Sequence, residues 1–303
     1  MTDAAPTPPR RIGLTYNPRL EGARALAEKL RGEIAGRGLE AWIEDETEDE
    51  VDGPAFSGAD LVVCLGGDGT VLRCAHLVNG SQTLILGVNL GRLGFLTELD
   101  ASQIEAQLGD VLAGGGRIET RTMIRAAIDR TGDVYHGLNE AVVGRATLSR
   151  AIQLAVDVDD QRIADYRCDG VIVASATGST AYALSVGGPV IHPEASELVL
   201  VPVAPHLAAA NAVVLPGSAR VRLTLEPRQE AVLSIDGVSD FELREGDSVV
   251  VTRSDHQARF LRLKPPTDFY QRMAAQLGWH RPGGTAQPLP TATGKRASGQ
   301  TGK

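Results

Sequence analysis

The chain has 303 residues, of which 43% are hydrophobic and 22% are charged, and its formal net charge is −8. This length allows a full hydrophobic core and favours two domains. The acidic balance argues against a general binder of nucleic-acid backbones, which needs a surplus of Lys and Arg. A polyanionic ligand would therefore be held by local devices, namely backbone amides, a few basic side chains and a metal ion.

Apolar residues are spread over short segments that do not approach the roughly 20 consecutive apolar residues of a membrane-spanning helix. Residues 1–10 are polar and rich in Pro, without the apolar stretch of a secretory signal. The three cysteines are odd in number and lack metal-ligand spacing, which suits a reducing compartment. We expect a soluble, cytoplasmic protein that binds neither nucleic acid nor membrane.

Predicted strands and helices alternate through the first third of the chain. Leu26, Leu30 and Ile34 recur every four residues and mark an amphipathic helix, whereas residues 61–65 are continuously apolar, as in a strand buried on both faces of a parallel sheet. Further strands are expected at residues 12–16, 39–43 and 83–88, and further helices at residues 70–78 and 102–112. This alternation predicts a doubly wound, Rossmann-like α/β domain at residues 11–116, after a disordered N-terminus at residues 1–10.

The apolar period changes to two in the second half of the chain. Residues 152–158 and 221–225 alternate apolar with other side chains, as strands covered on one face do. We therefore predict a mainly antiparallel β domain at residues 117–265, built from two packed sheets. A helical pattern returns within a C-terminal segment at residues 266–281, and residues 282–303 are expected to form a disordered tail.

The segment Gly66-Gly67-Asp68-Gly69-Thr70 follows a predicted buried strand and leads into a helix. Its glycines would let backbone amides approach a phosphate, and the helix N-terminus favours negative charge. Asp68 is anionic and cannot hold phosphate, so it either accepts a proton from a hydroxyl or binds Mg²⁺ or its waters. A tight turn whose Asp caps the helix is an equally good interpretation of these residues alone.

This pentapeptide resembles the motif shared by NAD kinases, diacylglycerol and sphingosine kinases, and 6-phosphofructokinases, and by itself it implies only phosphoryl transfer to a hydroxyl. Residues 87–96, GVNLGRLGFL, resemble a second signature of NAD kinases that lipid and sugar kinases are not expected to have. Within it, Phe95 offers a flat apolar surface for an adenine, although an ordinary core aromatic is a comparable interpretation.

Asn139-Glu140 and residues 177–185, TGSTAYALS, extend the resemblance into the β-rich half. In NAD kinases the Asn-Glu pair holds the adenine and ribose, and the longer segment lines the dinucleotide site. The resemblance implies that Asp169 accepts a hydrogen bond from the nicotinamide carboxamide, that Thr180 and Ser185 supply hydroxyls, and that Tyr182 stacks. Without the other motifs, a turn at residues 139–140 and a capped helix start at residues 177–185 would be the simpler interpretations.

Other candidates rest on weaker patterns. Arg73, Arg150 and Arg167 could hold a diphosphate or the phosphoryl donor, although each taken singly is an ordinary surface arginine. Asp236 lies in a segment that resembles a late family motif, with a hairpin turn as the alternative. The chain departs from the family at Ala176, where relatives commonly have Pro, at Ala204, where they commonly have Cys, and at residues 207–212, which lack the usual Asn-Arg-Pro.

The resemblance runs in order from about residue 12 to residue 279 and implies an NAD kinase. Such an enzyme phosphorylates the 2′-hydroxyl of the adenosine ribose of NAD, using ATP or polyphosphate with Mg²⁺, with Asp68 as general base or metal-positioning carboxylate. It further implies a homodimer or homotetramer and a C-terminal helix that packs back on the N-terminal domain. The rival hypotheses are a lipid or sugar kinase and a non-catalytic NAD sensor. The residues expected at the NAD site are Asp68, Gly69, Arg73, Phe95, Asn139, Glu140, Arg150, Arg167, Asp169, Thr180, Ala181, Tyr182, Ser185, Ala204 and Asp236, and those of the phosphate loop are Gly66, Gly67, Gly69 and Thr70.

Overall fold

The computed structural model describes residues 6–45, 56–91, 94–147, 150–206 and 211–279. It divides into a unit at Met1–Pro265 and a unit at Pro266–Lys303. Residues 1–5 of the expected N-terminal disorder and the whole expected tail at residues 282–303 lie outside the described residues. Pro6 and Pro9 are buried, and the Arg10 backbone N–H donates to the Asp60 carboxylate.

The first part of the chain forms a parallel sheet with helices on both faces. Its strands are β1 (Arg11–Tyr16), β2 (Glu40–Asp45), β3 (Leu61–Gly66) and β4 (Leu84–Asn89), in the order β2-β1-β3-β4. Helices α1 (Ala23–Gly36) and α3 (Ala101–Leu112) share one core with the sheet, and α2 (Asp68–Leu77) contributes to a separate core with other residues of the same strands. The predicted doubly wound fold is confirmed, and the carboxyl ends of β1, β3 and β4 meet at one edge.

Residues of the β-rich part form an antiparallel sheet that packs on a second sheet. The antiparallel sheet has the order β13-β12-β11-β8-β15-β16. Its strands are β8 (Glu140–Arg145), β11 (Gly170–Ala174), β12 (Leu198–Val203), β13 (Val213–Leu215), β15 (Ala231–Ile235) and β16 (Ser239–Leu243). Val143 and Val171 of this sheet share a core with Leu154 and Leu223 of the facing strands. The prediction of two packed sheets is therefore confirmed.

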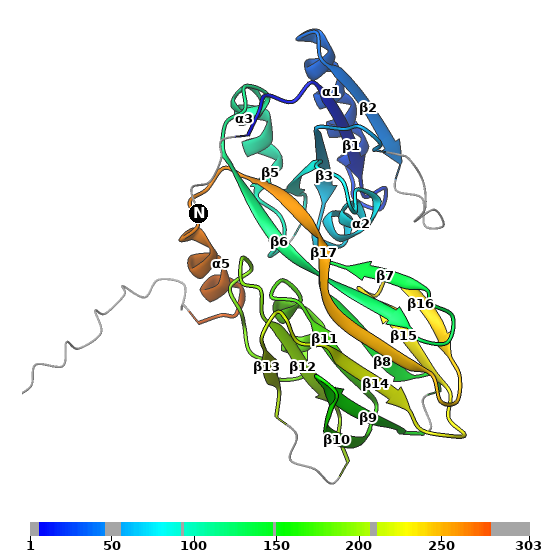
Figure 1. Ribbon diagram of the computed structural model, residues 1–303. Helices are drawn as coiled ribbons and strands as arrows, with labels where there is room; N and C mark the ends of the chain where they lie inside the picture. Colours follow the sequence, from blue (N-terminus) through cyan, green and yellow to red (C-terminus); the bar gives the residue numbers. More distant parts are fainter. Residues whose placement is uncertain (1–5, 46–55, 92–93, 148–149, 207–210, 280–303) are drawn as a thin grey trace, which may run out of the picture. The chain divides into compact units, whose positions relative to one another are not determined.

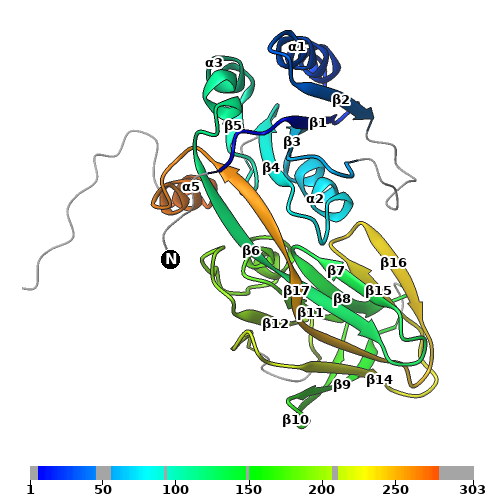
Figure 2. The same cartoon turned by 45° about the horizontal axis from the view of Figure 1, so that its top comes forward.

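The facing sheet continues into the parallel sheet through one long strand, β17 (Ser248–Arg262). β17 pairs antiparallel with β14 (Val221–Leu225) near its start and parallel with β4 near its end, where Arg259 lies opposite Leu84. The resulting order is β10-β9-β14-β17-β4-β3-β1-β2, with β9 at Ile152–Val158 and β10 at Gln161–Cys168. Figures 1 and 2 show β17 and its antiparallel partner β6 (Arg117–Ile128) running together from one half to the other.

Two short strands, a 3-10 turn and two further helices complete the description. β5 (Leu99–Asp100) pairs with β4, and β7 (Val134–Gly137) pairs with β6. A 3-10 turn at Gly178–Thr180 and α4 (Tyr182–Ser185) follow β11. The unit at Pro266–Lys303 contains α5 (Asp268–Gln276), where a helix was predicted, and its packing on the N-terminal domain stays a prediction. Among the helices described, none combines the length and the apolar character that crossing a membrane requires.

Candidate active site

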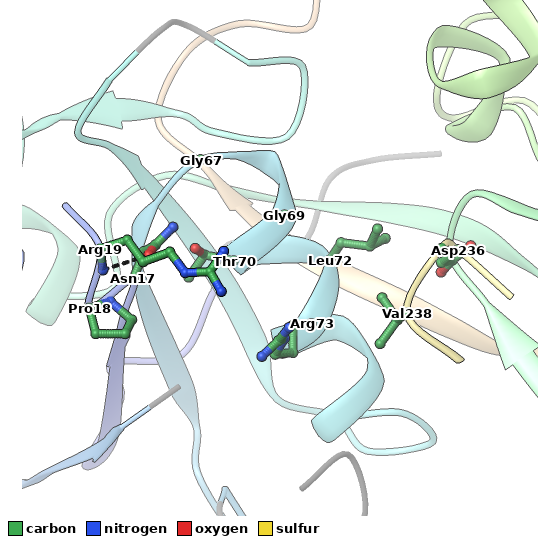
Figure 3. A pocket seen from close by; sticks show the side chains of 11 residues that line it. Asn17, Pro18, Arg19, Gly67, Gly69, Thr70, Leu72, Arg73, Asp236 and Val238 are labelled. Atoms are coloured by element: carbon green, nitrogen blue, oxygen red, sulfur yellow. Dashed lines mark hydrogen bonds between the residues drawn. The ribbon is translucent and has the colours of Figure 1, made fainter. Parts of the chain in front are cut away.

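A cavity of about 340 Å³ lies at the carboxyl edge of the parallel sheet, beside the start of α2. Figure 3 shows Asn17 to Arg19 on one side of the first turn of this helix, and Asp236 and Val238 on the other. The lining residues are Asn17, Pro18, Arg19, Gly67, Gly69, Thr70, Leu72, Arg73, Asp236, Gly237 and Val238. The cavity thus joins the end of β1, the N-terminus of α2 and the turn between β15 and β16.

The glycines of the loop have two different roles. A Cβ on Gly66 would run into the Thr70 side chain, so this glycine permits close packing inside the turn. A Cβ on Gly67 or Gly69 would meet no described atom within 4 Å. These two glycines therefore leave open space at the N-terminus of α2, where unpaired backbone N–H groups favour an anion.

Asp68 is the first residue of α2, and its carboxylate holds the second glycine-rich segment. Its Oδ2 accepts the Phe95 N–H at 2.8 Å, and its Oδ1 accepts the Leu96 N–H at 2.9 Å. The N-cap of α2 is Gly67, so the alternative in which Asp68 caps the helix is wrong. A Cβ on Gly94 would collide with the Asp68 carboxylate, which explains the glycine there. Each carboxylate oxygen keeps a second lone pair for a ligand hydroxyl.

Asp236 binds backbone groups of the Asn-Glu motif. Its side chain is fully buried and accepts the N–H groups of Leu138 at 2.6 Å and of Asn139 and Glu140 at 2.8 Å each. It also shares a hydrogen bond of 2.8 Å with His76 Nε2 from α2. Asp236 therefore fixes the Asn-Glu turn beside the helix that carries Asp68. Its predicted contact with NAD stays a prediction.

Glu140 is a buried carboxyl group with an unused oxygen. Its Oε2 has no hydrogen-bond partner among the described residues. Burial, and secondarily the charge of Asp236, raise the pKa of Glu140 to about 8, while a hydrogen bond from the Tyr182 backbone N–H acts in the opposite direction. The buried Thr177 Oγ1 also lacks a partner in the described part of the chain. Such orphaned groups are rare in folded proteins and are typical of a ligand site.

The segment at residues 177–185 packs against the Asn-Glu turn. The Ser175 hydroxyl donates to the Leu138 carbonyl at 2.6 Å, and the Asn139 carbonyl accepts the Ser175 N–H at 2.8 Å. A Cβ on Gly178 would collide with the backbone of Asn139. Tyr182 and Ser185 are exposed, and Thr180 and Ala181 are half-buried. The structure therefore brings these predicted residues together with Asn139 and Glu140.

Four other predicted residues lie elsewhere in this chain. Ala174 at the end of β11 is paired with Glu140, whereas Gly170 at its start is paired with Gly144. At ~3.4 Å per residue, the start of β11 therefore lies about 14 Å along the strands from the Asn-Glu motif. Arg167, Asp169 and Ala204 cluster at that distant end, where Asp169 pairs with Arg145 at 3.0 Å. Arg150 is also separate and lines another cavity of about 1350 Å³. Their roles toward NAD stay predictions.

Sequence reasoning missed Asn17, Arg19 and His76 as residues of this region. Asn17-Pro18 directly follows a parallel strand whose carboxyl end points to the site edge, and this position was the available signal. His76 carries no local signal, because its partner Asp236 is 160 residues away. Within the described ranges, no group of three or more His, Cys, Asp or Glu side chains could hold a metal ion.

Both halves of the chain resemble known proteins. Residues 10–116 match the model of the ATP-NAD kinase N-terminal domain, and residues 138–263 match that of the C-terminal domain. The NAD kinase of Chloroflexus aggregans is 38% identical over 272 residues, which cover 88% of this chain and 98% of that protein. The chain belongs to the NAD kinase family. The predicted family, the kinase activity and the phosphorylation of NAD with ATP are thereby confirmed at the level of the family.

Further relatives agree with this assignment. The NAD kinase of Dehalococcoides mccartyi is 35% identical over 272 residues, which cover 88% of this chain and 96% of that protein. The crystal structure of an NAD kinase from Archaeoglobus fulgidus in complex with ATP is 25% identical, with a TM-score of 0.71 over 88% of this chain and 99% of that chain. Yeast NADH kinase complexed with NADH shares the fold, with a TM-score of 0.82 at 20% identity over 94% of this chain and 90% of that chain.

Proposed function

We propose that the enzyme transfers the γ-phosphoryl group of ATP to the 2′-hydroxyl of the adenosine ribose of NAD, with Asp68 as the general base. The observation that carries this proposal is the position of Asp68 between two glycines that line the cavity, with its carboxylate turned to the loop at residues 94–96. The start of α2 then separates a donor side from an acceptor side. An in-line transfer needs the attacking and leaving oxygens on opposite sides of phosphorus.

The donor side suits a phosphate chain. Gly67 and Gly69 present open space at a helix N-terminus, and Arg19 and Arg73 line the same cavity. Backbone N–H groups and guanidinium groups are the donors that bind phosphate oxygens best. ATP fits this description, and inorganic polyphosphate shares the chemistry that these groups would recognise.

The acceptor side supplies a carboxylate and an adenosine site. Asp68 takes the proton of the 2′-hydroxyl as that oxygen attacks the γ-phosphorus and the bond to the β–γ bridging oxygen breaks, which releases ADP. The Phe95 N–H donates to the Asp68 carboxylate, so Phe95 lies beside Asp68, and its ring provides an apolar surface for adenine. Asn139, Glu140 and Tyr182 provide an amide, an unpaired carboxyl oxygen and an exposed ring for the rest of the dinucleotide.

Magnesium fits this site as an ion carried by the triphosphate. Because the described residues contain no cluster of metal-ligating side chains, Asp68 would contribute at most one carboxylate or bind through water. The ion would neutralise charge on the transferring phosphoryl oxygens.

We also propose that the protein associates into a homodimer or homotetramer and is located in the cytoplasm. In the described part of the antiparallel sheet, β13 is an edge strand on which Val213 and Val214 are exposed, and apolar edge strands favour pairing with another chain. The three cysteines are buried with free thiols, as in a reducing compartment. Light scattering after size-exclusion chromatography distinguishes a monomer from a homodimer or homotetramer.

A coupled assay tests the reaction directly. The protein is incubated with Mg-ATP and NAD, and an NADP-specific dehydrogenase then reports any product that carries the 2′-phosphate. NADP should accumulate in proportion to enzyme and time. Measurable NAD binding without NADP formation would contradict the proposal and favour an NAD sensor.

A further inference from the structure

Arg262, the last residue of β17, is a buried arginine outside the sequence motifs. Only 1% of its side chain is exposed. Its Nη1 donates to the Leu96 carbonyl at 3.0 Å and lies 3.3 Å from Glu98 Oε2, and its Nε donates to Glu119 Oε1 at 3.0 Å. Its guanidinium carbon also lies 4.8 Å from the centre of the Phe260 ring. The guanidinium therefore connects the end of β17 to the loop that binds Asp68.

The charged side chains next to Arg262, namely Glu98, Glu119 and Arg121, are almost completely shielded from solvent. Glu119 lies between Arg262 and Arg121, and although burial alone would raise its pKa, these two guanidinium groups hold the pKa of Glu119 well below its usual range. Glu98 Oε1 accepts the N–H groups of Leu263 at 2.9 Å and Lys264 at 2.8 Å. Buried ion pairs often give no more stability than apolar residues of the same volume, so this network calls for a role beyond stability.

Leu96 is held at both ends of its backbone. Its N–H donates to Asp68 Oδ1, and its carbonyl accepts from Arg262. Its side chain is buried, and a Cβ on Gly87 would approach its carbonyl oxygen to 3.2 Å, so the glycine lets the Leu96 backbone pack close to β4. The orientation of this residue therefore determines where its N–H and that of Phe95 place the Asp68 carboxylate.

We propose that Arg262 is a positioning residue that fixes Asp68 for phosphoryl transfer through the backbone of Leu96. The inference rests on the catalytic role proposed for Asp68. Loss of the guanidinium leaves the buried Leu96 carbonyl without its donor, and the Leu96 backbone shifts so that the carbonyl recovers a partner. Because a displacement of about 1 Å of a catalytic group costs on the order of 10²-fold in rate, turnover falls while the donor cavity stays intact.

Arg121 provides a matched control within the same network. It is 2% exposed, donates Nε to the same Glu119 oxygen at 2.8 Å, and lies 4.8 Å from the same Phe260 ring. Replacing either arginine by Met removes one buried guanidinium from Glu119 and Phe260. The two replacements differ in that Arg262→Met also removes the hydrogen bond to the Leu96 carbonyl.

The experiment compares Arg262→Met with Arg121→Met by kcat, by KM for ATP and by amide hydrogen exchange at Phe95 and Leu96. Both variants should unfold at lower temperature. Arg262→Met should lower kcat by roughly 10- to 100-fold with little change in KM for ATP, and should expose the Phe95 and Leu96 amides to exchange. An equal loss of kcat in Arg121→Met, or wild-type turnover in Arg262→Met, would overturn the proposal.

Arg262→Lys provides the test if the Met variant does not fold. An ammonium keeps the charge but cannot reproduce the guanidinium fork that reaches Leu96, Glu98 and Glu119 together. Amide protection and kcat should then fall together. If either stays at the wild-type level, the proposal fails.

A double-variant cycle separates this inference from the proposed role of Asp68. Arg262→Met should lower kcat little further when Asp68→Asn is already present, because both changes act on one group. The same fold loss in both backgrounds would show that Arg262 acts by another route, and only the inference would fail. Normal turnover of Asp68→Asn by itself would refute the role of Asp68.

Discussion

His76 on α2 and Asp236 after β15 share a hydrogen bond of 2.8 Å that links the helix carrying Asp68 to the Asn-Glu turn. Because the buried Asp236 carboxylate also receives three consecutive backbone N–H groups, it acts as a rigid anchor between the two halves of the site.

Asp236→Ala should destabilise the protein and weaken NAD binding. Removal of the carboxylate leaves three backbone N–H groups and His76 without their acceptor, which should cost about 3 kcal/mol of unfolding free energy and raise KM for NAD more than KM for ATP. Denaturant unfolding and steady-state kinetics measure both effects. Asp240→Asn, an exposed carboxylate on β16, is the control and should stay within about 0.5 kcal/mol of the wild type.

Asp68→Asn should keep the fold and much of the NAD affinity but lose most of the turnover. The amide cannot take a proton from the 2′-hydroxyl, and general-base catalysis contributes about 10²- to 10⁴-fold. NADP formation and NAD titration by calorimetry separate the two properties. Near-normal phosphorylation would exclude the base and the metal-positioning role together. Asp110→Asn, exposed on α3, should leave kcat unchanged.

Gly94→Ala should reduce turnover by displacing Asp68. The added Cβ would collide with the Asp68 carboxylate, whereas at Gly91, in the same loop, it would meet no described atom within 4 Å. We expect a loss of kcat of at least about tenfold for Gly94→Ala, since small shifts of a catalytic group are costly, and almost none for Gly91→Ala. Equal kinetics of the two variants would show that the contact does not matter.

The raised pKa of Glu140 predicts a dependence of stability on pH. The folded-state pKa of about 8 lies above the ordinary value of 4.5, so the folded protein binds the additional proton between these values. The contribution of this group to stability is therefore greatest below pH 4.5. It falls by roughly 1.4 kcal/mol for each pH unit between 4.5 and 8, and it is constant above pH 8. Unfolding of wild type and Glu140→Gln at several pH values isolates this contribution, and a constant difference between them would contradict it.

The same group should couple NAD binding to proton release. Ribose hydroxyls donate to a carboxylate, so binding favours the charged form of Glu140 and NAD affinity should fall as the pH drops below 8. Calorimetric titrations in buffers of different ionisation enthalpy measure the released proton. In Glu140→Gln the release and the pH dependence should both be lost.

Local patterns predicted the elements of the site but not the contacts between them. The apolar run before Gly66 and the glycines around Asp68 predicted a strand, a loop and a helix, because each depends on neighbouring residues. The partners of Asp68 lie 27 and 28 residues away, and periodicity carries no information about such pairs. Arg150 was predicted to hold a diphosphate or the phosphoryl donor, but β8 carries the chain away from the Asn-Glu turn before this residue, and its role stays a prediction.

The position of β17 in the sequence has a consequence for biogenesis. The parallel sheet is made of residues that leave the ribosome first, yet its strand β4 pairs with Arg259 and Phe260 near the end of the chain. Until β17 has been synthesised, the start of β4 at Leu84 and Ile85 presents an open edge of the kind that promotes aggregation. The N-terminal half is therefore expected to complete its sheet only after nearly all of the chain has been translated, and a fragment that ends at residue 116 should be prone to aggregation.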